Sequence, residues 1–104
     1  MDKKVLSLGQ KLKELLESKL GKVELIIYGS RARGDYSPDS DLDVCVIVEQ
    51  VDAGVRRVVS ELCWEVGFSS GIVIVPVIFS QKELKGPLGD SPLYHKVRQE
   101  GIRL

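Results

Sequence analysis

The sequence lacks several features that define a class of protein at once. Its longest apolar run, residues 72–79, is far shorter than the ~18 to 20 residues of a membrane-spanning helix. It has no net charge, with 15 basic and 15 acidic side chains, which argues against the basic surface of a general nucleic-acid-binding protein. Its first residues contain no apolar signal-peptide core followed by a cleavage site. We therefore expect a cytoplasmic protein that contacts neither membrane nor nucleic acid directly.

Cysteine and histidine are too scarce to suggest a metal site or a catalytic role. The two cysteines, Cys45 and Cys63, have no metal-ligand spacing, and we expect them to be buried free thiols. The one histidine, His95, lies far along the chain from any motif, and we expect it at the surface. The sequence also has no glycine loop followed by Gly-Lys-Ser/Thr and no Gly-x-Gly-x-x-Gly, which excludes a P-loop and a dinucleotide-binding fold.

The sequence does contain helix and strand patterns that together suit one domain. Its 104 residues, 43% of them hydrophobic, suit a single domain over 1–104. Apolar spacing predicts helix, strand, strand, helix, strand and helix over residues 3–20, 23–28, 42–48, 53–66, 72–79 and 92–100. This order predicts an α/β fold with a small mixed sheet of about three strands flanked by helices. The helix between the second and third strands is a right-handed crossover if those strands are parallel.

Individual residues set the ends and neighbours of these elements. We expect Asp52 to cap the helix from residue 53 and Gly67 to end it, whereas residues 80–83 match a capping box for a further short helix. Pro76 lacks the N–H that a central strand needs, so the third strand is predicted at an edge. Trp64 is interpreted as the rim of the core, with a partner interface as the alternative.

Acidic residues are concentrated in one segment. Residues 35–52 contain six carboxylates and no Lys or Arg. Asp41 and Asp43 stand two residues apart where a strand begins, so their side chains leave the same face, with Cα atoms ~7 Å apart. Oxygen ligands from two aspartates, completed by water and phosphate, suit Mg²⁺. The alternative is two solvated residues at the mouth of a strand.

A glycine-serine pair follows the first strand, twelve residues before Asp41. Gly29 allows a close approach of the backbone to a phosphate, and the Ser30 hydroxyl adds a hydrogen-bond donor. Arg31 and Arg33 follow at once, and we expect them either to pair with the β- and γ-phosphates or to balance the acidic segment as solvated cations.

Gly29-Ser30, ten residues and then Asp41-Leu42-Asp43 together resemble the GS-x10-D-x-D signature of nucleotidyltransferases related to DNA polymerase beta. The string GSRARGDYSPDSDLDVCVIV is similar to the minimal nucleotidyltransferases, the MNT family. The resemblance implies the nucleotidyltransferase fold, ATP as substrate and Mg²⁺ as cofactor. It implies that Gly29 and Ser30 bind nucleotide and that Asp41 and Asp43 are metal ligands and catalytic. Ser40 also matches the family pattern, which implies that it supports either the bound nucleotide's phosphates or the loop.

The same resemblance implies a partner. MNT proteins are often antitoxins of a HEPN-domain ribonuclease toxin, and some transfer AMP to one of its tyrosines. We therefore expect an adenylyltransferase that acts on a hydroxyl of a HEPN toxin. Formation of a homo-oligomer is compatible with the sequence.

One feature departs from the superfamily. Many members carry a third carboxylate on the strand after the crossover helix, and residues 72–79 contain none. Acceptor, water or a carboxylate from elsewhere in the chain can take its place. The alternatives are a protein that neutralises its partner by complex formation alone, and a subunit of a small-molecule adenylyltransferase.

Overall fold

The structure is a computed structural model that describes residues 2–104. Its elements are α1 (Lys3–Leu20), β1 (Glu24–Tyr28), α2 (Ser30–Arg33), β2 (Leu42–Val48), α3 (Ala53–Ser70), β3 (Ile74–Ser80), α4 (Gln81–Lys85), the 3₁₀ helix η1 (Pro87–Asp90), α5 (Pro92–Glu100) and β4 (Ile102–Arg103). No helix within residues 2–104 is both long and apolar enough to cross a membrane.

The strands form one mixed sheet in the order β3-β2-β1-β4. β1 is antiparallel to β2 and to β4, and β2 is parallel to β3. The α/β class is confirmed, and the two strands that α3 joins are parallel, the condition under which the sequence predicted a crossover. The sheet has four strands where the sequence predicted about three, because the two-residue β4 is too short to leave a periodic pattern.

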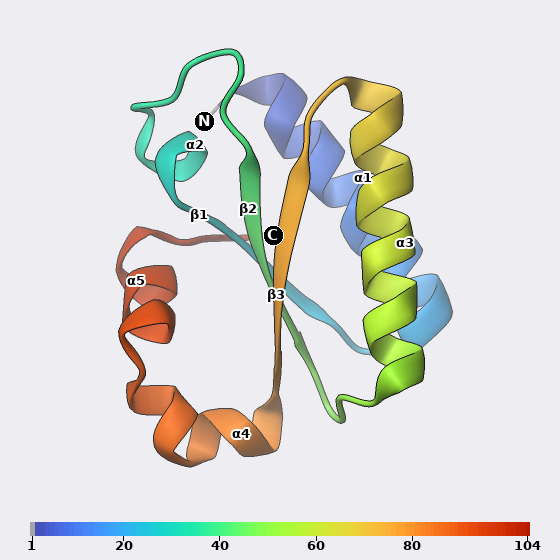
Figure 1. Ribbon diagram of the computed structural model, residues 1–104, viewed down its shortest axis with the longest axis vertical. Helices are drawn as coiled ribbons and strands as arrows, with labels where there is room; N and C mark the ends of the chain where they lie inside the picture. Colours follow the sequence, from blue (N-terminus) through green and yellow to red (C-terminus); the bar gives the residue numbers. More distant parts are fainter. Residues whose placement is uncertain (1) are drawn as a thin grey trace.

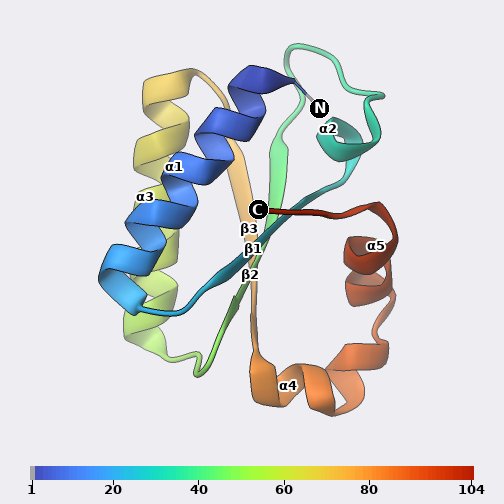
Figure 2. The ribbon, with the colours of Figure 1, turned by 180° about the vertical axis from the view of Figure 1, so that it is seen from behind.

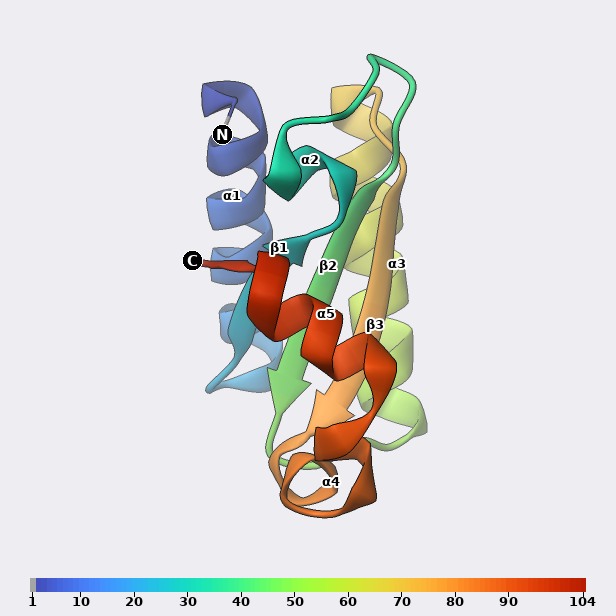
Figure 3. The same ribbon diagram turned by 90° about the vertical axis from the view of Figure 1, so that its left-hand side faces the viewer.

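The helices form two layers, one on each side of the sheet (Figures 1 and 2). α1 and α3 cover one face, and α4 and α5 lie on the other. Figures 1 and 2 view the sheet edge-on, and in Figure 3, which looks onto one face of the sheet, α5 lies in front of the strands and α1 and α3 lie behind them. Alternate residues of β2 therefore enter different cores, so that Val44 and Val46 pack with α1 and α3 while Cys45 and Ile47 pack with α5. This explains the near-continuous apolar run of β2, which is buried on both faces.

Several local predictions are confirmed. Asp52 caps α3 by accepting from the Val55 N–H at 2.8 Å. Ser80 and Glu83 form the capping box of α4, and β3 with Pro76 lies at a sheet edge. Cys45 and Cys63 are buried free thiols, and burial raises the pKa of each to about 12.

Two local predictions are wrong. Gly67 does not end α3, which continues to Ser70 and ends before Gly71, the residue that adopts the left-handed conformation. Gly67 is instead buried against β3, where a Cβ atom would collide with the Ile72 carbonyl oxygen. Trp64 is not at the core rim, because it is 68% exposed. Helical periodicity places Trp64 between core positions, and no element within residues 2–104 covers that side of α3.

Candidate active site

The two halves of the motif meet at one end of the sheet. β1 ends at Tyr28, whose Cα partner across the antiparallel pair is Asp43 near the start of β2. The residues that follow β1 and those that open β2 are therefore neighbours, although Gly29 and Asp41 are twelve positions apart. Figure 1 shows the single turn of α2 beside the chain that enters β2.

Gly29 fits against Asp43 as only a glycine can. Its backbone has φ +80° and ψ −158°, a region essentially restricted to glycine. A Cβ atom there would collide with the Asp43 carboxylate oxygen Oδ2. α2 begins at the next residue, Ser30, so the first N–H groups of this turn have no carbonyl partner within the helix. The turn thus offers free backbone donors and a hydroxyl directly beside a carboxylate.

Arg31 holds the loop between α2 and β2. It is one of two polar residues classed as buried within residues 2–104, with 5% exposure. Its Nε donates to the Ser40 carbonyl at 3.0 Å and its Nη2 to the Pro38 carbonyl at 3.3 Å. The guanidinium also stacks 4.7 Å from the centre of the Tyr36 ring. These contacts draw the loop back onto α2 and thereby bring Asp41 toward the Gly29–Ser30 turn.

Ser40 takes part in the same loop. Its hydroxyl accepts from the Ser37 N–H at 2.9 Å, and its own N–H donates to the Ser37 carbonyl at 3.0 Å. The residue before Asp41 is therefore fixed by a tight turn within the loop.

Arg33 pairs with carboxylates on two sides. Its Nε lies 3.2 Å from Asp35 and its Nη1 lies 2.9 Å from Glu100 at the end of α5. The Arg33 side chain is 39% exposed, so its charge reaches solvent at the mouth of the site. Unlike Arg31, Arg33 has a guanidinium that an incoming phosphate can reach.

The electrostatics of the site favour a bound cation. Burial raises the pKa of Asp43, and the Asp41 charge raises it further, while Lys96 and Arg33 act in the opposite direction and Glu100 adds to the rise. Burial and the neighbouring Asp43 also raise the pKa of Tyr28 to about 12. A half-buried carboxylate beside others of like charge binds a proton or a cation more readily than a free one.

The donor set fits Mg²⁺ with substrate oxygens. Asp41 is exposed and Asp43 half-buried at the start of β2, and both supply hard oxygen ligands. No group of three or more His, Cys, Asp or Glu side chains within residues 2–104 is arranged to hold a metal ion. Two protein carboxylates with water and phosphate completing the shell are the arrangement that Mg²⁺ commonly takes in phosphoryl-transfer sites.

Sequence reasoning missed the contribution of α5. Lys96 and Glu100 stand one helical turn apart on α5, and both act on Asp43. The sequence predicts that Lys96 and Glu100 lie one turn apart on a helix. It does not predict that β4 pairs with β1, which places the preceding helix α5 beside the motif. On β3, the residue in register with Asp43 is Val75. The position on β3 where a third carboxylate could stand beside Asp43 is thus occupied by an apolar side chain.

Comparisons with known proteins identify the family of this chain. The family model for the nucleotidyltransferase domain matches residues 10–97, and the chain belongs to this family of nucleotidyltransferase enzymes. One curated relative is the Methanocaldococcus jannaschii protein named "Putative protein adenylyltransferase MJ0604". It is 33% identical over 78 residues, which cover 75% of this chain and 73% of the relative.

Two solved structures share the fold. A toxin-antitoxin complex with AMP-PNP contains a chain with a TM-score of 0.66 at 20% identity, over 91% of this chain and 70% of that one. A tri-AMPylated Shewanella oneidensis HEPN toxin in complex with its MNT antitoxin gives a TM-score of 0.60 at 18% identity, over 94% and 69% of the two chains.

Proposed function

We propose that this nucleotidyltransferase transfers AMP from ATP to a hydroxyl of a partner protein with the help of Mg²⁺, and that it acts in the cytoplasm on a HEPN-domain toxin. The observation that carries the proposal is the packing of the Gly29 turn against Asp43, with Asp41 beside it. This arrangement puts phosphate donors and metal-ligating oxygens side by side. A site for nucleotide alone would not need the two aspartates.

Each motif residue has a role in this proposal. Gly29 and Ser30 hold the triphosphate, and Arg33 meets its outer phosphates. Asp41 and Asp43 would hold Mg²⁺, which would neutralise phosphate charge and help to orient the α-phosphate. Arg31 and Ser40 act through the loop that positions Asp41.

The transfer step itself is a displacement at phosphorus. The acceptor oxygen forms a bond to the α-phosphorus, and the bond from that phosphorus to the bridging oxygen of the β-phosphate breaks. Pyrophosphate leaves with the electron pair, and the hydroxyl proton passes to solvent or a nearby carboxylate. Correct positioning and charge neutralisation supply most of the acceleration in such reactions.

Relatives support a protein as the acceptor. The curated relative is named as a protein adenylyltransferase, and one structural neighbour is an antitoxin bound to a toxin that carries AMP. The likeness to the solved complexes concerns the fold, so the identity of the partner rests on this proposal and its test.

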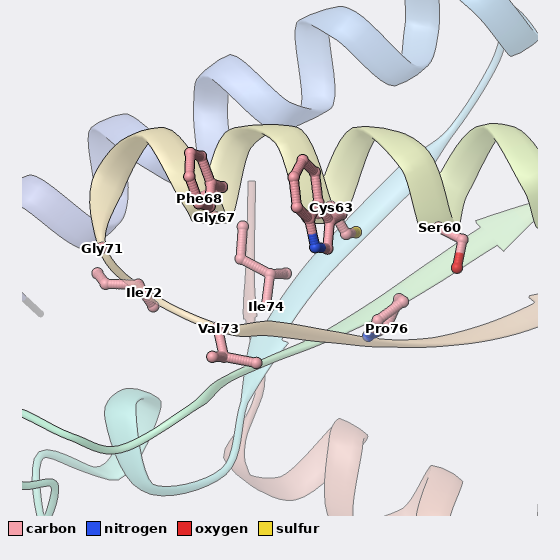
Figure 4. A pocket seen from close by; sticks show the side chains of 10 residues that line it. Ser60, Cys63, Gly67, Phe68, Gly71, Ile72, Val73, Ile74 and Pro76 are labelled. Atoms are coloured by element: carbon pink, nitrogen blue, oxygen red, sulfur yellow. The ribbon is translucent and has the colours of Figure 1, made fainter.

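The surface next to the site also favours a protein partner. Trp64 and Phe68 on α3 stack at 5.0 Å and are 68% and 75% exposed. Between α3 and the free edge of β3 runs an apolar groove of about 540 Å³ (Figure 4). Val73, 63% exposed, lies in this groove and accepts a hydrogen bond from the N–H of Leu42. This backbone hydrogen bond connects one wall of the groove to the residue between the two aspartates.

We propose that the acceptor protein docks on this groove with an apolar ridge flanked by Lys or Arg. The charged residues that line the groove and its rim are Glu61 and Glu65, so a second copy of this chain would bring like charges together. Pro76 removes one N–H from the β3 edge, which disfavours an added strand. Side-chain packing of a basic amphipathic helix fits both facts.

A second candidate function is neutralisation by binding alone. Val75 favours it, because the position on β3 beside Asp43 lacks the carboxylate found in many superfamily members. In that case the partner would be bound without being modified.

The test is the intact mass of a co-purifying or genome-neighbouring HEPN-domain protein after incubation with this chain, ATP and Mg²⁺. Addition of AMP that disappears with Asp43→Asn supports transfer. An unchanged mass with a stable complex favours the binding function, and AMP transfer to a small alcohol or amine alone would contradict the protein acceptor.

Trp64→Ser and Phe68→Ser separate docking from chemistry. Both should weaken the complex without changing ATP binding, because neither residue touches the motif. Light scattering of the isolated chain tests whether a second copy occupies the groove. If the chain is a dimer that Trp64→Ser dissociates, the groove is assigned to a second copy and not to the acceptor protein.

A further inference from the structure

Glu100 is the one carboxylate outside the motif that contacts the Gly29–Ser30 turn within residues 2–104. Its Oε2 accepts a hydrogen bond from the Gly29 N–H at 3.1 Å, and its Oε1 pairs with Arg33 Nη1 at 2.9 Å. One side chain therefore holds both ends of α2, from a position 71 residues later in the chain. The Glu100 side chain is 21% exposed, so water competes weakly for these bonds.

We propose that Glu100 is a positioning residue of the nucleotide site, one that fixes the Gly29–Ser30 turn and Arg33 for phosphate binding. The proposal rests on the nucleotidyltransferase function proposed above and adds to it a residue from outside the motif.

Gly29 gains from such a support because glycine has more backbone freedom than any other residue, so an unsupported turn would not keep one direction. Asp43 closes the space on the Cα side of Gly29, and Glu100 binds the N–H on the other. A carboxylate that accepts from a backbone N–H makes one of the stronger hydrogen bonds in proteins. With both sides held, the Ser30 hydroxyl and the N–H groups of the turn keep one direction.

Packing of α5 and pairing of β4 fix the position of Glu100. Val97, one turn earlier in α5, is fully buried, and the Tyr94 ring packs edge-on against Phe79. β4 follows at once and pairs with β1, with Ile102 opposite Ile27. β1 is the strand that leads into Gly29. The carboxylate and the turn it holds are thus attached to the same part of the sheet.

Glu100 also orients the Arg33 side chain. Between Glu100 and Asp35 the guanidinium is held at the mouth of the site and loses little rotamer freedom when a phosphate arrives. Without Glu100, Arg33 would have to be ordered at the moment of binding, which costs affinity.

The experiment measures the affinity of AMP-PNP with Mg²⁺ by calorimetry for wild type, Glu100→Ala, Glu100→Gln and the control Gln99→Ala. Gln99 is the exposed neighbour on the same helix. Loss of a charge-assisted hydrogen bond corresponds to about 10- to 100-fold weaker binding for Glu100→Ala. Glu100→Gln keeps an acceptor for the Gly29 N–H and should recover part of this loss, whereas Gln99→Ala should stay within about two-fold.

A second measurement separates positioning from general support of the fold. Thermal stability is recorded for each variant, and NMR hydrogen exchange is followed at the Gly29 amide. Positioning requires faster exchange at Gly29 in Glu100→Ala, with the amides of α1 and α3 unchanged. If Glu100→Ala does not fold, the same comparison is made with Glu100→Gln.

The outcomes are distinguishable. Affinity of Glu100→Ala within two-fold of wild type overturns the inference, and so does tighter binding, which would make Glu100 a competitor of the phosphates. Failure of wild type to bind AMP-PNP overturns the proposed function and the inference with it. Loss of binding in Asp43→Asn but not in the Glu100 variants overturns the inference alone.

Discussion

Replacing Gly29 by alanine tests whether the close approach of the turn to Asp43 creates the nucleotide site. The new Cβ atom would meet the Asp43 carboxylate, and the backbone would have to hold φ +80° with a side chain attached. Either the carboxylate moves or the turn does. In both cases the proposed phosphate donors and the proposed metal ligand lose their present alignment.

The structure sets the size of the effect. A residue other than glycine in this backbone region costs roughly 1–3 kcal/mol, and each kcal/mol lowers the melting temperature of a domain this size by about 4–8 °C. Displacement of the carboxylate should in addition weaken AMP-PNP binding by about 10- to 150-fold, the loss of an interaction with a charged group of about 1.5–3 kcal/mol.

Gly34→Ala is the matched control. Gly34 ends α2 with φ +91°, but a Cβ atom added there would have no neighbour within 4 Å among residues 2–104. It should lose about 1–2 kcal/mol of stability from the left-handed backbone and keep its nucleotide affinity. Thermal melts and calorimetry with AMP-PNP and Mg²⁺ measure both quantities. Equal losses of affinity in Gly29→Ala and Gly34→Ala would refute the reasoning, because only Gly29 approaches Asp43.

Three further predictions concern the carboxylates and the loop. The raised pKa of Asp43 means that the folded state binds more protons than the unfolded state between ~3.9 and the folded value, so stability falls as pH rises through that window. Asp43→Asn should therefore melt higher than wild type at pH 7 without Mg²⁺ and lose this advantage under strongly acidic conditions; a lower melting temperature at pH 7 would contradict the assignment. Arg31→Lys cannot reach both loop carbonyls as the planar guanidinium does, and should lower stability by about 1–3 kcal/mol and weaken Mn²⁺ binding measured by electron paramagnetic resonance, whereas unchanged binding would separate the loop from the metal site. Val75→Asp places a carboxylate beside Asp43 and should raise the rate of AMP transfer measured by intact mass; a lower rate in a folded variant would show that the acceptor needs the apolar side chain.

The fold was predictable where each element is determined by its own residues. α1 matches its predicted range, and β2 does too, because apolar spacing and the residues at the ends of both agree with the tertiary structure. The end of α3 was not predictable. Gly67 resembles a helix stop, yet it is needed for the contact with β3, and a sequence does not distinguish a glycine that ends a helix from one that lets a strand approach.

The site was predictable only in part, for a related reason. Gly29, Ser30, Asp41 and Asp43 form a local motif, and the structure brings them together at one end of the sheet. The roles of the two arginines depend on which partners surround them. Arg31 is buried under its own loop and Arg33 meets Glu100 from a distant helix, contacts that no local pattern contains.

The placement of Asp43 carries its own argument about function. A half-buried carboxylate beside Asp41 and near Glu100 has a raised pKa, so its ionised form at neutral pH destabilises the empty protein. Asn at this position would fill the same space without the charge. A residue that costs stability in the empty protein has to contribute elsewhere, and a bound cation would offset this cost. The charge that weakens the fold is therefore the feature that, in the function proposed above, binds Mg²⁺ together with a triphosphate.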